Sequence, residues 1–337
     1  MVRIVDIAER AGCSIAAVSR VLSLNPHKDA RVADETRSHI QQVAQEMGYR
    51  PNRLAEFMKR GKSPIIGVFL PKYANRLVAD LVFGLSEAAA AAGFPLALSF
   101  EMGFEAYARF LEDNIQSTNC GMISYPWFQL DRRALGLVDD YLGGGGKMVL
   151  LDVEGNDAVE DLKRRITHVS IDNRGGGALA AEALLRHPCK SHLVLSPRKH
   201  RLEGFADALA KAGVHDLASL GTCDNDFLEG EGALREVLAF VKEGDRLPCG
   251  IFATSDRAAL RAMTYLMANG VAIGKDVFLV GYDDLYLSEW TCPGLTSVRQ
   301  PFQAVGRLAV EKLVRLIYEK DAASETLRPE LVARGSA

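Results

Sequence analysis

The chain has 337 residues, 48% hydrophobic and 25% charged, with a formal net charge of −3, which is typical of a soluble globular protein with two or three compact units. It contains no run of about 18 apolar residues, so no membrane span is predicted, and the absence of an apolar signal region favours a cytoplasmic location. The six cysteines form no CxxC pair, which argues against a disulfide framework or a zinc site.

Residues 4–22 are predicted to form two short helices joined by a tight turn. Apolar residues recur at helical spacing, Gly12 ends the first helix, and Ser14 can cap the second. The apolar side of the second helix leaves four residues facing outward: Ile15, Ala16, Ser19 and Arg20. Such a small, partly polar face suits the DNA major groove, although a plain helical hairpin with a solvated face has the same pattern.

The next segments extend this helical head. Residues 32–47 are predicted to form a third helix, with Ala33 at the position where a capping side chain would stabilise its start. Residues 51–60 have proline at the first turn and are predicted to form a short helix, which would be marginal alone in water. Residues 1–62 hold eleven basic and seven acidic residues, whereas the remainder is acidic overall. A basic head on an acidic body is expected where only the head contacts phosphates.

From Pro64 onward, short apolar runs alternate with longer helical patterns, which predicts parallel sheets covered by helices on both faces. The predicted strands are Ile65–Leu70, Pro95–Phe100, Gly121–Tyr125, Lys147–Val153, His168–Ile171, His192–Leu195, His215–Leu220, Gly250–Ala253, Val277–Gly281 and Thr296–Gln300. Helical patterns between them include 76–92, 175–186, 202–212, 258–269 and 302–319.

Enzyme and phosphate-loop motifs are not matched. The glycine run 143–146 precedes a strand instead of following one, and Met148 stands where a phosphate loop needs Ser or Thr. The run Asn173–Gly177 lacks the dinucleotide-binding spacing and indicates a turn. The histidines are not at metal-ligand spacing, and no GxSxG motif is present. We therefore expect no catalytic residues, no metal and no cofactor.

The sequence resembles the lac repressor (LacI/GalR) family of bacterial transcription regulators. The resemblance rests on Asp6-Ile7-Ala8, Ala11-Gly12, Ala17-Val18-Ser19-Arg20-Val21-Leu22, Glu35-Thr36-Arg37 and Gly48-Tyr49-Arg50-Pro51-Asn52, and continues at intervals to Gln300. It implies an α/β chain with an N-terminal all-α helix-turn-helix domain and a two-lobed periplasmic-binding-protein-like domain with parallel sheets. The implied boundaries are 1–50 for the DNA-binding domain, 51–63 for the hinge helix and linker, 64–187 with 298–322 for the first lobe, and 188–297 with 323–337 for the second.

The resemblance also implies roles for individual residues. Major-groove contacts would come from Ser14, Ile15, Ala16, Ser19 and Arg20, backbone contacts from Thr36, Tyr49 and Asn52, and minor-groove contacts from Ala55 and Met58. Positions that face an effector in the interlobe cleft are Ser124, Asp152, Arg201, Phe227, Ser255, Asp283 and Gln300.

Two departures from the family pattern bear on the effector. The usual acidic-then-Asn-Pro-Phe-Phe run is replaced by a segment with the cations Lys72 and Arg76, and Ser255 stands where asparagine is common. A sugar or sugar derivative remains the effector implied by the resemblance. The predicted protein is a ligand-responsive regulator, expected to be a repressor, that binds a near-palindromic operator in double-stranded DNA as a homodimer. The alternatives are a two-lobed sugar receptor without DNA function and an enzyme on a doubly wound sheet.

Overall fold

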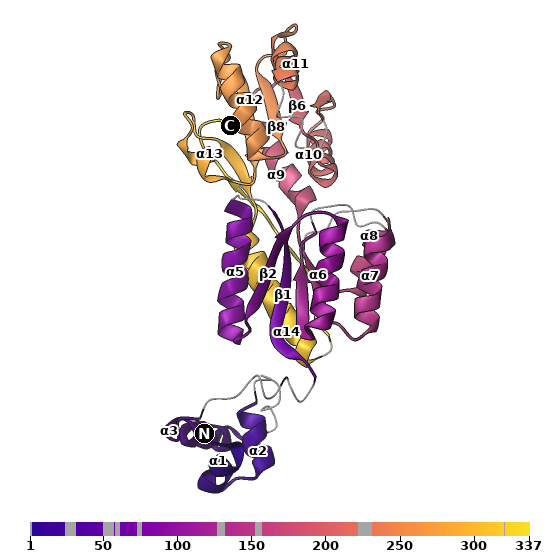
Figure 1. Cartoon of the computed structure of the whole chain (residues 1–337). Helices are drawn as coiled ribbons and strands as arrows, with labels where there is room; N and C mark the ends of the chain where they lie inside the picture. The colour runs from indigo at the N-terminus through magenta and orange to yellow at the C-terminus, as the bar shows by residue number, and fades with distance from the viewer. Residues whose placement is uncertain are drawn as a thin grey trace.

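A computed structural model describes residues 2–23, 32–49, 57, 61–72, 76–126, 132–151, 157–221, 231–319 and 321–337. It contains a three-helix head followed by two α/β lobes (Figure 1). In these ranges, no helix combines the length and the apolar character needed to cross a membrane.

The head consists of α1 (Ile4–Ala11), α2 (Ile15–Val21) and α3 (Asp34–Glu46). Gly12 ends α1 with a φ of 62°, a conformation that glycine adopts without a steric penalty. The Ser14 hydroxyl accepts a hydrogen bond from the amide of Ala17 at 3.1 Å, which confirms the predicted cap of α2. Apolar side chains from the three helices form one small core: Ile7, Ala8, Ala11, Val18, Val21, Ile40, Val43 and Ala44.

Helix α3 lacks a side-chain cap, as the sequence predicts, because its first flanking residue is Ala33. The backbone of Ala33 already has the extended conformation of a capping position, with a ψ of 145°. We expect Ala33→Ser to stabilise the head by about 1 kcal/mol, because the new hydroxyl can accept from the first-turn amide of Thr36, which has no partner within an α-helix. Hydrogen exchange of the α3 amides measures this gain, and unchanged exchange would contradict it.

The first lobe is built on a six-stranded sheet with the order β11-β5-β4-β3-β1-β2. All of its pairings are parallel. Its strands are β1 (Ser63–Pro71), β2 (Leu96–Glu101), β3 (Asn119–Ser124), β4 (Met148–Leu151), β5 (His168–Ile171) and β11 (Glu325–Leu327). Its helices are α5 (Arg76–Ala92), α6 (Phe104–Gln116), α7 (Arg132–Gly143), α8 (Asp157–Arg165) and α14 (Phe302–Tyr318).

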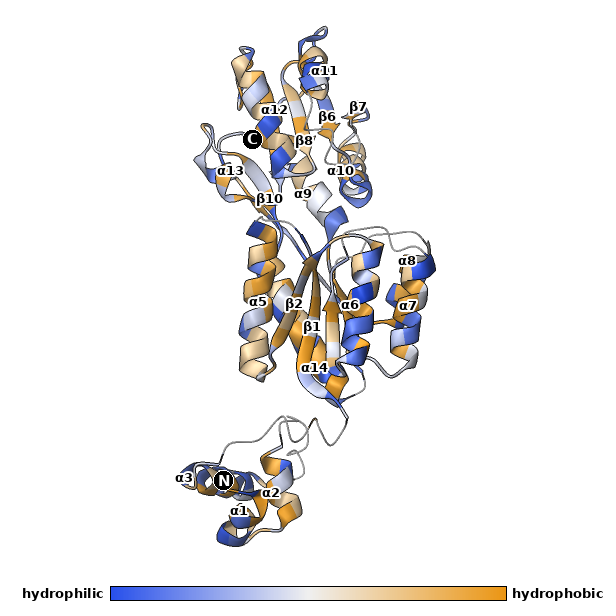
Figure 2. Cartoon of the chain, viewed as in Figure 1, coloured by the Kyte–Doolittle hydropathy of each residue, from blue (hydrophilic) through white to orange (hydrophobic). Residues whose placement is uncertain are grey.

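Alternation along the strands gives the first sheet two apolar faces. Val68 and Leu70 point toward α5 and α14, whereas Phe69 between them points toward α6 and α7. Figure 2 shows apolar colour along β1, α14 and most of α5, and polar colour on α6 and α7. Burial on both faces explains the nearly continuous apolar runs in the sequence.

The second lobe has a similar six-stranded sheet with the order β12-β10-β9-β8-β6-β7, in which the edge strand β12 pairs antiparallel with β10 and the other pairings are parallel. Its strands are β6 (Ser191–Leu195), β7 (Leu217–Leu220), β8 (Cys249–Ala253), β9 (Val277–Tyr282), β10 (Thr296–Arg299) and β12 (Glu330–Val332). Its helices are α9 (Asn173–Leu184), α10 (Lys199–Lys211), α11 (Glu231–Lys242), α12 (Asp256–Ala268) and α13 (Tyr286–Trp290). Each predicted strand overlaps one observed strand, but β11 and β12 were not predicted, because each has only three residues.

The chain passes between the two lobes three times, and all three passages differ from the expected boundaries. Helix α9 packs on α10 and on the second sheet, so the first passage lies at Asp172, between β5 and α9, and not at residue 187. Strand β10 pairs with β9 and β12, so the second passage follows Arg299 and not residue 297. Strand β11 pairs with β5, so the third passage lies between Leu327 and Glu330 and not at residue 322. Strand β11 has three residues at a sheet edge and leaves little periodic signal in the sequence, which explains the difference at the third passage. The boundary at residue 297 was implied by the resemblance and divided a strand that the sequence itself predicts over residues 296–300.

Candidate functional site

The outward face of α2 is the candidate DNA-binding surface. Ser14, Ile15, Ala16, Ser19 and Arg20 are all exposed, and Ile15 is 53% exposed despite its apolar side chain. Val18 and Val21 face the opposite way and are buried against α1 and α3. The three-helix core therefore holds the predicted recognition residues on one free side of a rigid helix.

Of the other predicted DNA-contact residues, the structure describes only some. Thr36, on the first turn of α3, and Tyr49, just after α3, are both half-buried. Asn52, Ala55 and Met58 lie outside the described residues. The head is held together by the apolar core that α1, α2 and α3 form.

At the carboxyl ends of the second lobe's strands, Arg201 joins several predicted effector residues. Its guanidinium donates from Nε to Asn173 Oδ1 at 2.8 Å, from Nη1 to the Thr254 carbonyl at 2.7 Å, and from Nη2 to Gln300 Oε1 at 3.4 Å. It also lies 3.6 Å over the ring of Tyr282. The side chain is almost fully buried, so these contacts fix the cation in one position.

Asp283 completes this group, which we call the Arg201 cluster (Arg201, Asn173, Tyr282, Asp283 and Gln300). Its Oδ1 accepts from Gln300 Nε2 at 2.7 Å and lies 3.9 Å from Arg201 Nη1. Burial raises the pKa of Asp283, while the nearby Arg201 and Arg198 and the bond from Gln300 lower it. Asp283 has a φ of 113°, a strained backbone conformation of the kind that is concentrated at functional sites.

A buried carboxyl, Asp256, holds the strained loop in place. It accepts from the Leu285 amide at 2.7 Å, from the Ser288 hydroxyl at 2.5 Å and from the Ser297 hydroxyl at 2.6 Å. Burial and the neighbouring Asp283 raise the pKa of Asp256 to about 7. Asp256 thereby ties α12, the loop after β9, α13 and β10 to one another.

The remaining predicted effector residues are not all brought to this cluster. Ser255 caps α12 by accepting from the Ala258 amide at 3.3 Å. Ser124 is fully buried at the end of β3, where its hydroxyl donates to the Tyr107 hydroxyl at 3.0 Å. Asp152 and Phe227 lie outside the described residues.

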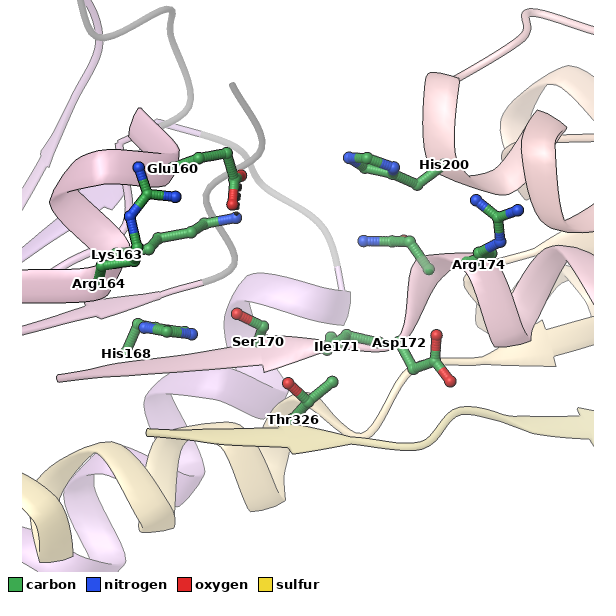
Figure 3. A pocket seen from close by; sticks show the side chains of 11 residues that line it. Glu160, Lys163, Arg164, His168, Ser170, Ile171, Asp172, Arg174, His200 and Thr326 are labelled. Carbon is green, nitrogen blue, oxygen red and sulfur yellow. Dashed lines mark hydrogen bonds and ion pairs between the residues drawn. The ribbon is translucent and has the colours of Figure 1, made fainter. Parts of the chain in front are cut away.

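A cavity of about 440 Å³ opens between the lobes beside the Arg201 cluster. Asn173 belongs to both, because it lines the cavity and accepts from Arg201. In Figure 3, His200 of the second lobe and Lys163 of the first lobe approach it from opposite sides, and Ser170 points into it from β5. The lining residues are Glu160, Lys163, Arg164, His168, Ser170, Ile171, Asp172, Asn173, Arg174, His200 and Thr326.

The glycine-rich run that begins at Asn173 forms the start of α9 and not a turn. An added Cβ at Gly177 would lie 2.0 Å from the Arg201 carbonyl, and one at Gly204 would lie 1.9 Å from the Arg174 carbonyl. Small residues therefore allow α9 and α10 to approach closely enough for Asn173 to meet Arg201. Sequence reasoning missed Asn173 because it compared the run with dinucleotide-binding motifs and interpreted it as a turn.

Arg76, noted in the sequence as an unexpected cation, joins the two lobes on another side. From the first turn of α5, it donates to the Asp284 carbonyl at 2.8 Å and lies 4.4 Å over the ring of Tyr286. Its Nε also donates to Asp80 at 3.2 Å. Asp284 itself binds Arg299 and Arg334, each at 2.7 Å. Arg76 thus contacts the same loop that carries Asp283.

Comparisons with known proteins agree with both parts of this structure. Residues 3–52 match the model for bacterial regulatory proteins of the lacI family, and residues 190–337 match a periplasmic binding protein-like domain. The chain is 30% identical to the HTH-type transcriptional regulator GalS of Salmonella typhimurium, over 92% of this chain and 88% of GalS. It is 26% identical to the ribose operon repressor of Escherichia coli, over 98% of each chain.

Solved structures show the same fold. A transcriptional regulator CelR–cellobiose complex superposes with a TM-score of 0.69 at 24% identity and covers all of both chains. A lac repressor dimer bound to operator and an anti-inducer superposes with a TM-score of 0.68 at 23% identity, over 99% of this chain and 98% of that one. The chain therefore belongs to the LacI family: it is a DNA-binding transcriptional regulator with a helix-turn-helix head and a periplasmic-binding-protein-like effector domain, and not an enzyme.

Proposed function

We propose that this protein is a ligand-responsive repressor that binds a near-palindromic operator as a homodimer and senses a small carbohydrate-like metabolite between its lobes. One observation carries the proposal: the same chain has an exposed recognition helix and two lobes with a cavity lined by polar side chains between them. A sugar receptor without DNA function would have no use for the face of α2.

The recognition face supports sequence reading in the major groove. Ser14, Ser19 and Arg20 offer hydrogen bonds to base edges, whereas Ile15 and Ala16 offer only apolar contact. The apolar pair would read shape and thymine methyl groups. The phosphate backbone would be held by Thr36, Tyr49 and Asn52. The minor groove would be entered by Ala55 and Met58.

We expect Arg20→Ala to weaken specific operator binding by roughly 1–3 kcal/mol, because an exposed arginine at this place can bind a base or a phosphate. A fluorescence-anisotropy titration measures the loss, with an operator duplex obtained by selection from random DNA. Lys211→Ala is the matched control, since Lys211 is an exposed cation at the end of α10 in the second lobe. Equal affinities for wild type and Arg20→Ala would reject this role.

An exposed apolar surface supports the homodimer. Phe83 lies seven residues after Arg76, hence on the same side of α5, and Arg76 contacts Tyr286 of α13. Figure 1 shows α5 and α13 along one side of the molecule. The exposed apolar residues of these elements and of the edge strand β2 are Phe83, Leu98, Phe100, Tyr286, Leu287 and Trp290. A patch of this kind usually marks a protein interface, and the related lac repressor structure is a dimer.

We expect Trp290→Glu to weaken dimerisation at least about tenfold, because Trp290 is 74% exposed in the single chain and would be buried with its partner. Sedimentation equilibrium measures the dimer dissociation constant. Ile115→Glu is the control, because Ile115 is exposed on α6, which covers the other face of the first sheet. If the two variants dimerise alike, this surface is not the interface.

The effector proposal rests on the interlobe cavity and the Arg201 cluster. A fixed cation, a carboxylate and amide groups can hold the hydroxyls of a small polar ligand. Two of the relatives are named for a sugar or solved with one, ribose and cellobiose. A ligand that touches both lobes would favour one arrangement of the lobes and so shift the population able to bind DNA.

Operator selection from random duplexes, repeated with candidate sugars, tests the whole proposal. We expect a near-palindromic sequence to be enriched, and one sugar class to change its recovery. Absence of any enriched sequence would contradict the DNA-binding part. An enriched sequence that no sugar affects would contradict the proposed effector class.

A further inference from the structure

Phe57 lies between the DNA-binding head and the first lobe, yet its side chain is part of the core of that lobe. It is 1% exposed and packs edge-on against Phe94, with ring centroids 5.7 Å apart. Its ring also lies 6.4 Å from that of Tyr318, which is 6.4 Å from Phe94. The Phe57 carbonyl accepts from the Lys62 amide at 3.0 Å. We call Phe57, Phe94 and Tyr318 the aromatic anchor.

The aromatic anchor shortens the connection between head and lobe. Tyr49 packs on the core of the head, and Phe57 follows it by eight residues. Without the anchor, the first fixed residue would be Ser63 at the start of β1, fourteen residues after Tyr49. Eight residues span at most about 29 Å and fourteen about 50 Å. Fixing Phe57 therefore removes roughly 20 Å of reach from each head.

One helix, α14, also joins the aromatic anchor to the Arg201 cluster. Helix α14 begins at Phe302, two residues after Gln300, and ends at Tyr318. Its 17 residues span about 25 Å, and it packs tightly on α5, where an added Cβ at Gly306 would lie 2.4 Å from the Leu81 carbonyl. Figure 1 shows α14 running along the first lobe beside the sheet. A packed helix thus connects Gln300 to the ring that holds Phe57.

We propose that Phe57 is a positioning residue that sets the spacing of operator half-sites by restricting where each head can lie. This inference rests on the proposed dimeric binding to operator. Moving two half-sites apart by two base pairs displaces them by about 7 Å along the duplex and also rotates one about its axis. A short connection makes such a displacement costly, whereas a longer connection allows both heads to follow their half-sites.

The test compares the selected operator with duplexes whose half-sites are one or two base pairs closer or farther apart. Anisotropy titrations use wild type, Phe57→Ala, Phe57→Leu and Phe110→Ala, all well below their unfolding temperatures. Phe110 is the matched control, because it is a buried aromatic of the same lobe that packs against Phe69 on the other face of the sheet. Its loss should lower thermal stability without lengthening the connection.

For wild type, we expect at least about tenfold weaker binding to the altered spacings, and for Phe57→Ala a difference of about threefold or less. Phe57→Leu, which keeps a buried side chain, should retain most of the discrimination. Phe57→Ala that discriminates like wild type would overturn the inference, as would Phe110→Ala losing discrimination equally. If wild type binds no duplex at all, the proposed function fails, and this inference fails with it.

Discussion

Replacing Arg201 by methionine is expected to destabilise the second lobe by about 3–5 kcal/mol and to abolish any response to effector. The substitution removes the Arg201 donor from three acceptors: the Thr254 carbonyl, Gln300 Oε1 and Asn173 Oδ1. Of these, Asn173 Oδ1 keeps the 3.3 Å bond from the Tyr282 hydroxyl. The substitution also leaves the carboxyl of Asp283 without its nearest cation, in a buried place. A methionine of similar length cannot replace a hydrogen-bonded charge.

Arg174→Met provides the matched control for this result. Arg174 is also an arginine beside the interlobe cavity, but it is 57% exposed and binds Glu203 and Asp207 at the surface. Exposed ion pairs of this kind contribute up to about 1 kcal/mol. Urea unfolding of both variants measures the difference. Stabilities within about 1 kcal/mol of each other would show that the Arg201 contacts do not hold the lobe together.

The second large effect is a pH dependence that comes from Asp256. Its pKa is raised to about 7 in the folded protein, against an ordinary value of 3.8. Between these values the folded state binds the proton and the unfolded state does not, so stability falls as the pH rises from about 4 to 7. The full difference corresponds to about 4 kcal/mol, and the part lost between pH 5 and 8 to about 3 kcal/mol.

Asp256→Asn isolates this contribution. An asparagine can still accept from Leu285 and Ser288 and donate to the Ser297 hydroxyl, so it retains much of the network without a titrating group. We expect the free energy of unfolding to fall by about 3 kcal/mol more in wild type than in Asp256→Asn between pH 5 and 8. Titratable groups that do not interact with Asp256 cancel in this comparison, whereas the neighbouring Asp283 belongs to the same coupled pair. Parallel pH profiles would contradict the raised pKa.

The parts of the structure that could be predicted are those with a repeating pattern. Apolar residues at helical spacing around Gly12 predicted α1 and α2. Short, nearly continuous apolar runs between helical patterns predicted β1 to β10. The resemblance to the lac repressor family placed Arg201, Asp283 and Gln300 in one interlobe cleft, and the structure brings these three side chains together.

Other features depend on contacts between distant segments and leave no local signal. Asn173 meets Arg201 only because Gly177 and Gly204 let two helices approach each other closely. Phe57 belongs to a segment whose pattern predicts a short helix, and nothing near it in sequence indicates Phe94 or Tyr318 as neighbours. Arg76 was recognised as an unusual cation, but its contact with Asp284 lies across two lobes.

The most direct measurement of the central claim is the affinity of the full chain for its selected duplex, titrated against salt, with and without the sugar that alters recovery in the selection. We expect the logarithm of the association constant to fall linearly with the logarithm of the salt concentration, and the sugar to change the affinity at least about fivefold at fixed salt. An affinity for that duplex no greater than for unrelated DNA, or one that no candidate sugar changes, would contradict the account.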